Sequence, residues 1–270
     1  MDLFQLLVLG TVQGITEWVP VSSKTMVTFT YLKFFQGDPA LVIPILMYVH
    51  LGTVIAAIIY FRNELASIIA EIAGRPWDFH HHAQRKSGFL VTALFFTSLV
   101  GIPLLLLEQW FFPTLDGNII YTLMGIGLII TGFLLLSHKV GNTRDDRDVT
   151  WKDGVLPGIL QGFSTLPGVS RSGTSSTGLI WRGFDSGSSF YLSFLLSIPT
   201  VILAELVLSY GSAGVVGLPV SNGFVLLLTS LVVGYLTLDV LLRVIKRINI
   251  AYLVFVLGLI IIAVGLFGIG

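Results

Sequence analysis

Six long apolar stretches divide the chain, and shorter polar segments separate them. A helix needs about 20 predominantly apolar residues to cross the hydrocarbon core of a bilayer. Each of the six stretches is close to that length. The pattern therefore predicts an all-α, polytopic membrane protein with transmembrane helices over residues 40–61, 88–107, 119–137, 189–210, 223–242 and 250–269.

The composition agrees with this interpretation. Hydrophobic residues make up 54% of the 270 residues and charged residues 11%, against about 25% charged in a soluble domain. Mean hydropathy is +0.89. These values exclude a soluble globular domain, a disordered chain and a basic nucleic-acid binder. The absence of cysteine excludes disulfides and thiolate chemistry. Asp2 stands where a signal peptide carries basic residues, so we expect no cleavable leader.

Charge in the connecting segments predicts how the chain crosses the membrane. Segments 62–87, 138–152 and 243–249 carry several Lys and Arg residues, whereas 108–118 and 211–222 carry none. The positive-inside rule places the three basic segments in the cytoplasm. For the spans to alternate, residues 1–39 must begin and end outside and 153–188 must begin and end inside. We therefore expect two re-entrant hairpins in a multi-pass protein of the plasma membrane.

These two hairpin segments resemble each other at an offset of 148 residues. The sequence predicts an inverted repeat with halves over 1–137 and 153–270, joined by the linker 138–152. Interrupted segments at matching positions of such repeats favour a site near the bilayer midplane. Irregular backbone at that depth must be buried in protein or line a wet cavity. The matching pairs are Gly10 and Gly158, Gln13 and Gln161, Gly14 and Gly162, Val21 and Val169, and Ser22 and Ser170.

Polar residues concentrate where each hairpin turns. Tip one is residues 20–25 and tip two is residues 167–176. Tip two surrounds the guanidinium of Arg171 with hydroxyls and glycines, a combination suited to a phosphoryl group. Ser22 or Ser23 becomes a nucleophile if a base takes its proton. The alternative interpretation is two kinked spanning helices whose small residues serve packing.

Two further ionisable residues lie within apolar segments. Gln13 and Glu17 share a helix face and are suited to holding a divalent cation or a water, or to orienting a hydroxyl. Alternatively, Glu17 is a buried carboxylate that only pairs with Arg171. His50 lies in the middle of the first span, where a lone histidine is either functional or an interhelical hydrogen-bonding residue.

Other polar residues carry weaker signals. Glu205 and Asp239 lie near the ends of the fourth and fifth spans and are interpreted as interfacial rather than catalytic. His80, His81 and His82 are adjacent rather than at helical ligand spacing. We therefore expect a solvated or headgroup-facing loop there.

The motifs together resemble the integral-membrane undecaprenyl-diphosphate phosphatases of the bacitracin-resistance type. Gln13-Gly-Ile-Thr-Glu17 resembles that family's first motif, and Pro20-Val-Ser-Ser23 its continuation. Pro167-Gly-Val-Ser-Arg-Ser172 resembles its second motif, with Ser175 where the family has Thr. The stretch from Ser193 to Pro199 is also similar, and the resemblance covers nearly the whole chain.

The resemblance implies six spanning helices with two opposed re-entrant hairpins. It also implies hydrolysis of a polyprenyl diphosphate to the monophosphate and phosphate with Mg²⁺ or Ca²⁺, which recycles the lipid carrier for cell-envelope glycans. Glu17 would be the essential carboxylate and a metal ligand, Ser23 the nucleophile and Arg171 the phosphate clamp. The expected substrate-binding residues are Gln13, Ser22, Lys24, Thr25, Ser170, Ser172, Gly173 and Ser175.

One position departs from the family. Met26 stands where the family usually carries a histidine, and a thioether cannot transfer a proton. We expect His50 to replace that histidine and Lys24 to add positive charge for the diphosphate. The departure also keeps open a transporter that moves a polyprenyl phosphate headgroup between leaflets without hydrolysis. A homodimer is compatible with either function.

Overall fold

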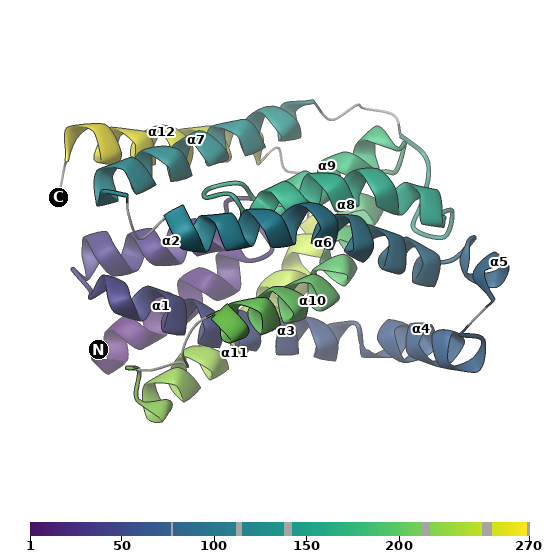
Figure 1. Ribbon diagram of the computed structural model, residues 1–270, viewed down its shortest axis with the longest axis horizontal. Helices are drawn as coiled ribbons and strands as arrows, with labels where there is room; N and C mark the ends of the chain where they lie inside the picture. Colours follow the sequence, from purple (N-terminus) through teal and green to yellow (C-terminus); the bar gives the residue numbers. More distant parts are fainter. Residues whose placement is uncertain (77, 112–114, 138–141, 212–216, 245–249, 269–270) are drawn as a thin grey trace.

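The computed structural model describes residues 1–270 except 77, 112–114, 138–141, 212–216, 245–249 and 269–270. In the described part the regular structure is helical, apart from one isolated bridge between Arg144 and Phe184. The expectation of an all-helical membrane protein is therefore confirmed (Figure 1).

Each predicted span corresponds to one helix. Five are long and apolar enough to cross a membrane. The sixth, α12 (Ala251–Phe267), is apolar and has 17 residues, about 26 Å at 1.5 Å per residue. Pro103 and Pro199 lie inside α6 and α10 without ending these helices. The five longer helices are α3 (Val42–Tyr60), α6 (Lys86–Phe111), α7 (Gly117–Leu136), α10 (Ser186–Gly211) and α11 (Val220–Val244).

Most of the described part of the basic segment 62–87 is helical, so the expectation of a loop there was wrong. It forms α4 (Arg62–Gly74) and α5 (Phe79–His82). Leu65, Ile68 and Ile72 recur at helical spacing, and Ile68 is buried in the core. His82 also differs from its predicted solvated state, because its Nδ1 lies 3.1 Å from Glu71 Oε1 and 3.0 Å from Ser87 Oγ.

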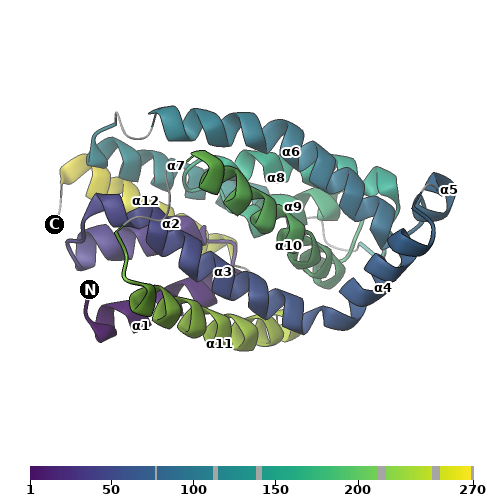
Figure 2. The same ribbon diagram turned by 60° about the horizontal axis from the view of Figure 1, so that its bottom comes forward.

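The helices run roughly along the long axis of the molecule. Both termini lie at one end, and α4 and α5 lie at the opposite end (Figures 1 and 2). This arrangement is the one that the charge pattern predicts, with the termini outside and segment 62–87 in the cytoplasm. Residues 112–114, 138–141, 212–216 and 245–249 of the predicted connecting segments lie outside the described residues.

Two short helical hairpins lie between the long helices. In the first, α1 (Leu3–Thr16) packs against α2 (Ser23–Phe29), which continues as a π-helical turn over Thr30–Phe34. In the second, α8 (Val155–Gly162) is followed by a 3₁₀ turn over Phe163–Thr165 and packs against α9 (Arg171–Trp181). Both hairpins reverse at the predicted tips.

Glycines bring the first helix of each hairpin close to a long helix. A Cβ at Gly14 would lie 2.7 Å from Val233 Cβ on α11, and one at Gly162 would lie 2.6 Å from Val100 Cβ on α6. The glycines are 148 positions apart, and Val100 and Val233 are 133 apart. Two further contacts, Gly10 with Thr229 and Gly158 with Phe96, show the same separations between the two glycines and between their two partners. This matching register is what a structural repeat requires.

A buried carboxylate fixes the second hairpin at the end of the molecule that carries α4 and α5. Asp153 is fully buried in the turn over Trp151–Gly154. Its oxygens accept hydrogen bonds from Arg144 Nη2 at 2.7 Å, Arg182 Nε at 2.9 Å and the Thr150 hydroxyl at 2.9 Å. Burial opposes ionisation of Asp153, but these donors outweigh it and hold the pKa of the carboxyl below its usual value.

Gly14→Ala tests the close packing of α1 on α11. The added methyl group meets Val233 and the backbone nitrogen of Gly234, so we expect a loss of about 1–3 kcal/mol. Thermal unfolding in detergent measures it. Gly74→Ala is the control, because a Cβ at Gly74 meets nothing within 4 Å. Equal stability of the two variants would contradict the packing argument.

Asp153→Asn tests the buried carboxylate. Because the pKa of Asp153 is lowered in the folded protein, the ionised carboxyl stabilises the fold fully above its ordinary pKa of 3.8. This stabilisation is lost as the pH falls through the lower pKa of the folded state. We expect a loss of about 1–3 kcal/mol at pH 7, with the difference from wild type shrinking in acid. Thermal unfolding at several pH values measures it, with the exposed Asp116→Asn as control. A difference independent of pH would refute the assignment.

Candidate functional site

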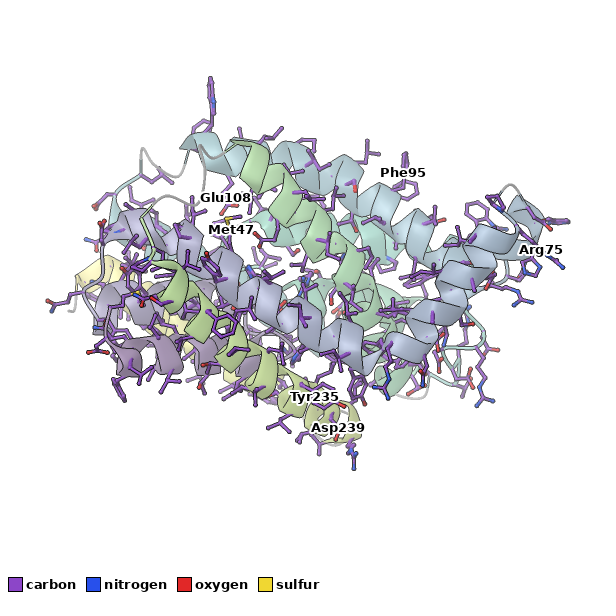
Figure 3. The ribbon with its side chains drawn as sticks, turned by 90° about the horizontal axis from the view of Figure 1, so that it is seen from below. Met47, Arg75, Phe95, Glu108, Tyr235 and Asp239 are labelled. Carbon is purple, nitrogen blue, oxygen red and sulfur yellow. The ribbon has the colours of Figure 1, made fainter. Side chains whose placement is uncertain are left out.

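One cavity of about 640 Å³ lies between the two hairpin tips and helices α3, α6 and α10. Its inner wall is polar, and its outer wall is mostly apolar. The outer residues Pro39, Val42, Trp110 and Leu208 lie near the helix ends that we predict to be external. Figure 3 labels Met47 and Glu108, which belong to the cavity lining. It also labels Tyr235 and Asp239, which lie on α11 and are not part of the lining. The polar lining includes Glu17, Ser22, Ser23, Lys24, His50, Thr97, Glu108, Gln161, Ser170, Arg171, Ser172, Thr200 and Glu205.

The carboxylate of Glu17 connects the polar groups of this lining. Its Oε2 accepts hydrogen bonds from Ser23 Oγ at 2.6 Å and from Gln13 Nε2 at 2.7 Å. Its Oε1 forms an ion pair with the guanidinium of Arg171. Ser23 begins α2 and Arg171 begins α9, and they are 148 positions apart. One carboxylate thus binds equivalent positions of the two hairpins.

The backbone geometry of the two tips places Ser23 and Arg171 beside this carboxylate. Ser22 has a left-handed φ of 59°, and its Oγ lies 3.1 Å from Thr25 Oγ1. In tip two, Gly168 has a φ of 81° and packs on the backbone of Met124, where a Cβ would clash. Ser170 caps α9 by accepting the Gly173 N–H at 3.3 Å.

Four of the expected substrate-binding residues lie one layer behind the cavity wall. They are buried, do not line the cavity, and each contacts a residue that does. Ser175, for example, donates its hydroxyl to the backbone oxygen of Arg171 at 2.8 Å. These residues position the lining rather than form it: Gln13 supports Glu17, Thr25 supports Ser22, Gly173 supports Ser170, and Ser175 supports Arg171. Ser170 and Ser172 do line the cavity, with their hydroxyls 3.2 Å apart.

His50 reaches the tip, as the sequence predicts. Its Nε2 lies 3.8 Å from Glu17 Oε2 and its Nδ1 lies 3.1 Å from Glu205 Oε1. Met26 packs against the main hydrophobic cluster instead. Glu205 was interpreted as interfacial, but it lines the cavity. Its signal in the sequence was a carboxylate within an apolar span, which is a functional candidate by default.

Lys24 forms an ion pair with Glu108, a residue that the sequence did not single out. Glu108 was expected to begin an external loop, but α6 continues through it to Phe111. Its side chain is 8% exposed and that of Lys24 is 36% exposed. The pair joins tip one to α6, so the charge of Lys24 is balanced within the cavity wall.

The oxygen donors near Glu17 suit a hard divalent cation such as Mg²⁺ or Ca²⁺. The described residues contain no cluster of three His, Cys, Asp or Glu side chains that would hold an ion alone. However, Gln13 Oε1 is buried without a hydrogen-bond partner, one helical turn before Glu17. Mg²⁺ commonly binds through one or two carboxylates and substrate phosphates. The donor set therefore fits a cation that is shared with a phosphorylated ligand.

Comparison with known proteins gives a consistent result. The family model for the bacitracin resistance protein BacA matches residues 6–265. A relative from Methanococcoides burtonii is 35% identical, with 96% of each chain covered. A relative from Methanopyrus kandleri is 33% identical, covering 96% of this chain and 94% of the relative. One from Treponema denticola is 32% identical, covering 95% and 94%. All three carry the name undecaprenyl-diphosphatase. On this match over nearly its whole length, the chain belongs to the BacA family.

Proposed function

We propose that this protein hydrolyses a polyprenyl diphosphate to the monophosphate and inorganic phosphate. The observation that carries the proposal is the Glu17 carboxylate, which holds a hydroxyl (Ser23) and a guanidinium (Arg171) at the inner end of an amphipathic cavity. A nucleophile, a base and a phosphate-binding cation are the groups that phosphoryl transfer requires. The relatives named undecaprenyl-diphosphatase support the same substrate class.

The two walls of the cavity suit the two parts of such a lipid. The diphosphate binds at the inner end, where Arg171 presents a bidentate fork to phosphoryl oxygens and Lys24 adds a second positive charge. The isoprenoid lies along apolar residues such as Leu46, Leu105 and Val201. Because the cavity extends toward the predicted external helix ends, the headgroup enters from the outer leaflet.

The reaction begins when Arg171 turns from Glu17 to the terminal phosphoryl group. Glu17, relieved of its cation, accepts a proton more readily and takes it from Ser23 Oγ. The Ser23 oxygen bonds to the terminal phosphorus, and the bond from phosphorus to the bridging oxygen breaks. The electron pair leaves with the lipid monophosphate. Water then cleaves the bond between Ser23 and phosphorus and releases inorganic phosphate.

A divalent cation carried by the diphosphate would lie beside Glu17 and would neutralise charge on the phosphoryl oxygens, leaving the Glu17 carboxylate to accept the Ser23 proton. Arg171 and Lys24 contribute to the same neutralisation from the protein side. Positioning and electrostatic stabilisation supply most of the catalysis in phosphoryl transfer.

Phosphate release from a polyprenyl diphosphate by the purified protein tests the proposal. With Mg²⁺ or Ca²⁺ we expect release by wild type and losses of at least about 10²-fold in Arg171→Ala and Ser23→Ala. Arg243→Ala and Ser67→Ala, at exposed positions away from the cavity, are the matched controls. Release retained in Ser23→Ala but lost in Arg171→Ala would assign the attack to water. If wild type binds the lipid monophosphate and releases no phosphate with any cation, the proposal fails in favour of headgroup transport.

Glu108→Gln tests whether the ion pair in the cavity wall limits substrate binding. The change removes the negative partner of Lys24, so the cavity becomes more positive. We expect the KM for the diphosphate to fall about threefold to tenfold at low salt, with a smaller effect at high salt. Steady-state kinetics with Lys24→Gln and the double variant as controls separates this effect from altered packing. An unchanged or raised KM in Glu108→Gln would contradict the prediction.

A further inference from the structure

We propose that Glu205 is a positioning residue that holds the imidazole of His50 with its Nε2 facing Glu17. His50 then carries the proton that Ser23 gives up. The inference rests on the proposed function, and it assigns a role to a carboxylate that the mechanism above does not use.

The two ring nitrogens of His50 face two different carboxylates. Nδ1 lies 3.1 Å from Glu205 Oε1 on α10, and Nε2 lies 3.8 Å from Glu17 Oε2 at the end of α1. A carboxylate beside Nδ1 accepts the proton of that nitrogen, so the neutral ring keeps its lone pair on Nε2. The lone pair then points toward the atom that receives the Ser23 proton.

The separation of 3.8 Å is consistent with an order of events. While Arg171, Ser23 and Gln13 occupy the Glu17 carboxylate, Nε2 lies just beyond hydrogen-bond distance. When Arg171 turns to the phosphoryl group, the carboxylate loses its strongest partner. A small movement then brings Glu17 Oε2 and His50 Nε2 into contact.

Linking α3 to α10 does not by itself require a charge. Ser175 and Ser193 link α9 to α10 with neutral hydroxyls at 2.6 Å. Glu205 is a carboxylate within an apolar span, and its second oxygen, Oε2, is buried without a hydrogen-bond partner. An ionisable side chain at such a position is costly and marks a functional group by default.

The proton balance of the first step is then complete. The proton leaves Ser23 Oγ, passes through Glu17 Oε2 and rests on His50 Nε2 between the carboxylates of Glu17 and Glu205. The departing lipid monophosphate takes it as it leaves. Glu17 is thereby restored as a carboxylate before water attacks the phosphorylated Ser23.

Two variants separate the charge of Glu205 from its hydrogen bond. Glu205→Gln keeps an oxygen that accepts the Nδ1 proton, whereas Glu205→Leu removes the acceptor. We expect kcat to fall about 10–100-fold in Glu205→Leu with KM little changed, and to fall markedly less in Glu205→Gln. Asp239→Asn, a carboxylate on α11 outside the cavity lining, is the control. Thermal unfolding of each variant shows that it is folded.

The tautomer of His50 gives a readout that does not depend on turnover. In ¹⁵N NMR at a pH where the ring is neutral, we expect Nδ1 protonated in wild type and the Nε2–H form in Glu205→Leu. The signal that disappears in His50→Gln assigns the resonance. The same tautomer in wild type and Glu205→Leu, or a wild-type kcat in a folded Glu205→Leu, overturns the inference.

The failure of this inference is distinguishable from the failure of the proposed function. If Ser23→Ala and Arg171→Ala lose phosphate release but Glu205→Leu keeps it, the proposed function stands and the role of Glu205 falls. If wild type releases no phosphate, the proposed function falls and the NMR tautomer alone decides whether Glu205 positions His50.

Discussion

The interaction on which the rest of the structure depends is the pairing of the Glu17 carboxylate with groups from both hairpins. Glu17 is 5% exposed, and a buried charge is costly unless donors surround it. Gln13 comes from its own helix, but Ser23 and Arg171 come from the first residues of α2 and α9. The two tips must therefore meet, and the cavity forms where they do. The glycine contacts of α1 and α8 allow this meeting, because they bring both hairpins close to α11 and α6.

The two hairpins have similar backbones, but the residues that they contribute to the site differ. The position equivalent to Glu17 in the second hairpin is Thr165, which donates its hydroxyl to the Gly162 backbone oxygen at 3.0 Å. The position equivalent to Ser23 is Arg171. Two carboxylates facing each other across the tips would raise each other's cost of ionisation, and one arginine would not neutralise both. The two similar hairpins therefore share one carboxylate, Glu17, which binds the Ser23 hydroxyl of one hairpin and the Arg171 guanidinium of the other.

The sequence predicted the spans and the centre of the site for different reasons. The spans follow from hydropathy, which is local. Ser23 and Arg171 were found from the polar residues at the two hairpin tips and from the resemblance to a known family. Glu205 was assigned to the interface and Glu108 was not singled out, because their partners are 155 and 84 positions away. Which way a side chain on a spanning helix points depends on the packing of that helix, and one sequence does not contain this information. Helix α4 was missed because the charge of segment 62–87 was interpreted as that of a connecting loop, and this outweighed the apolar period that buries Ile68.

Charge balance in the cavity explains why two cations, Arg171 and Lys24, are tolerated at this depth. Arg171 is paired with Glu17 and Lys24 with Glu108, so each cation has its own carboxylate before any ligand enters. An incoming diphosphate competes with both carboxylates for the same two cations and brings several negative charges of its own. The protein cannot balance those charges without leaving Glu17 and Glu108 unpaired. A divalent cation carried by the diphosphate would remove this conflict, because it would neutralise the ligand and leave the Glu17 carboxylate to act as the base.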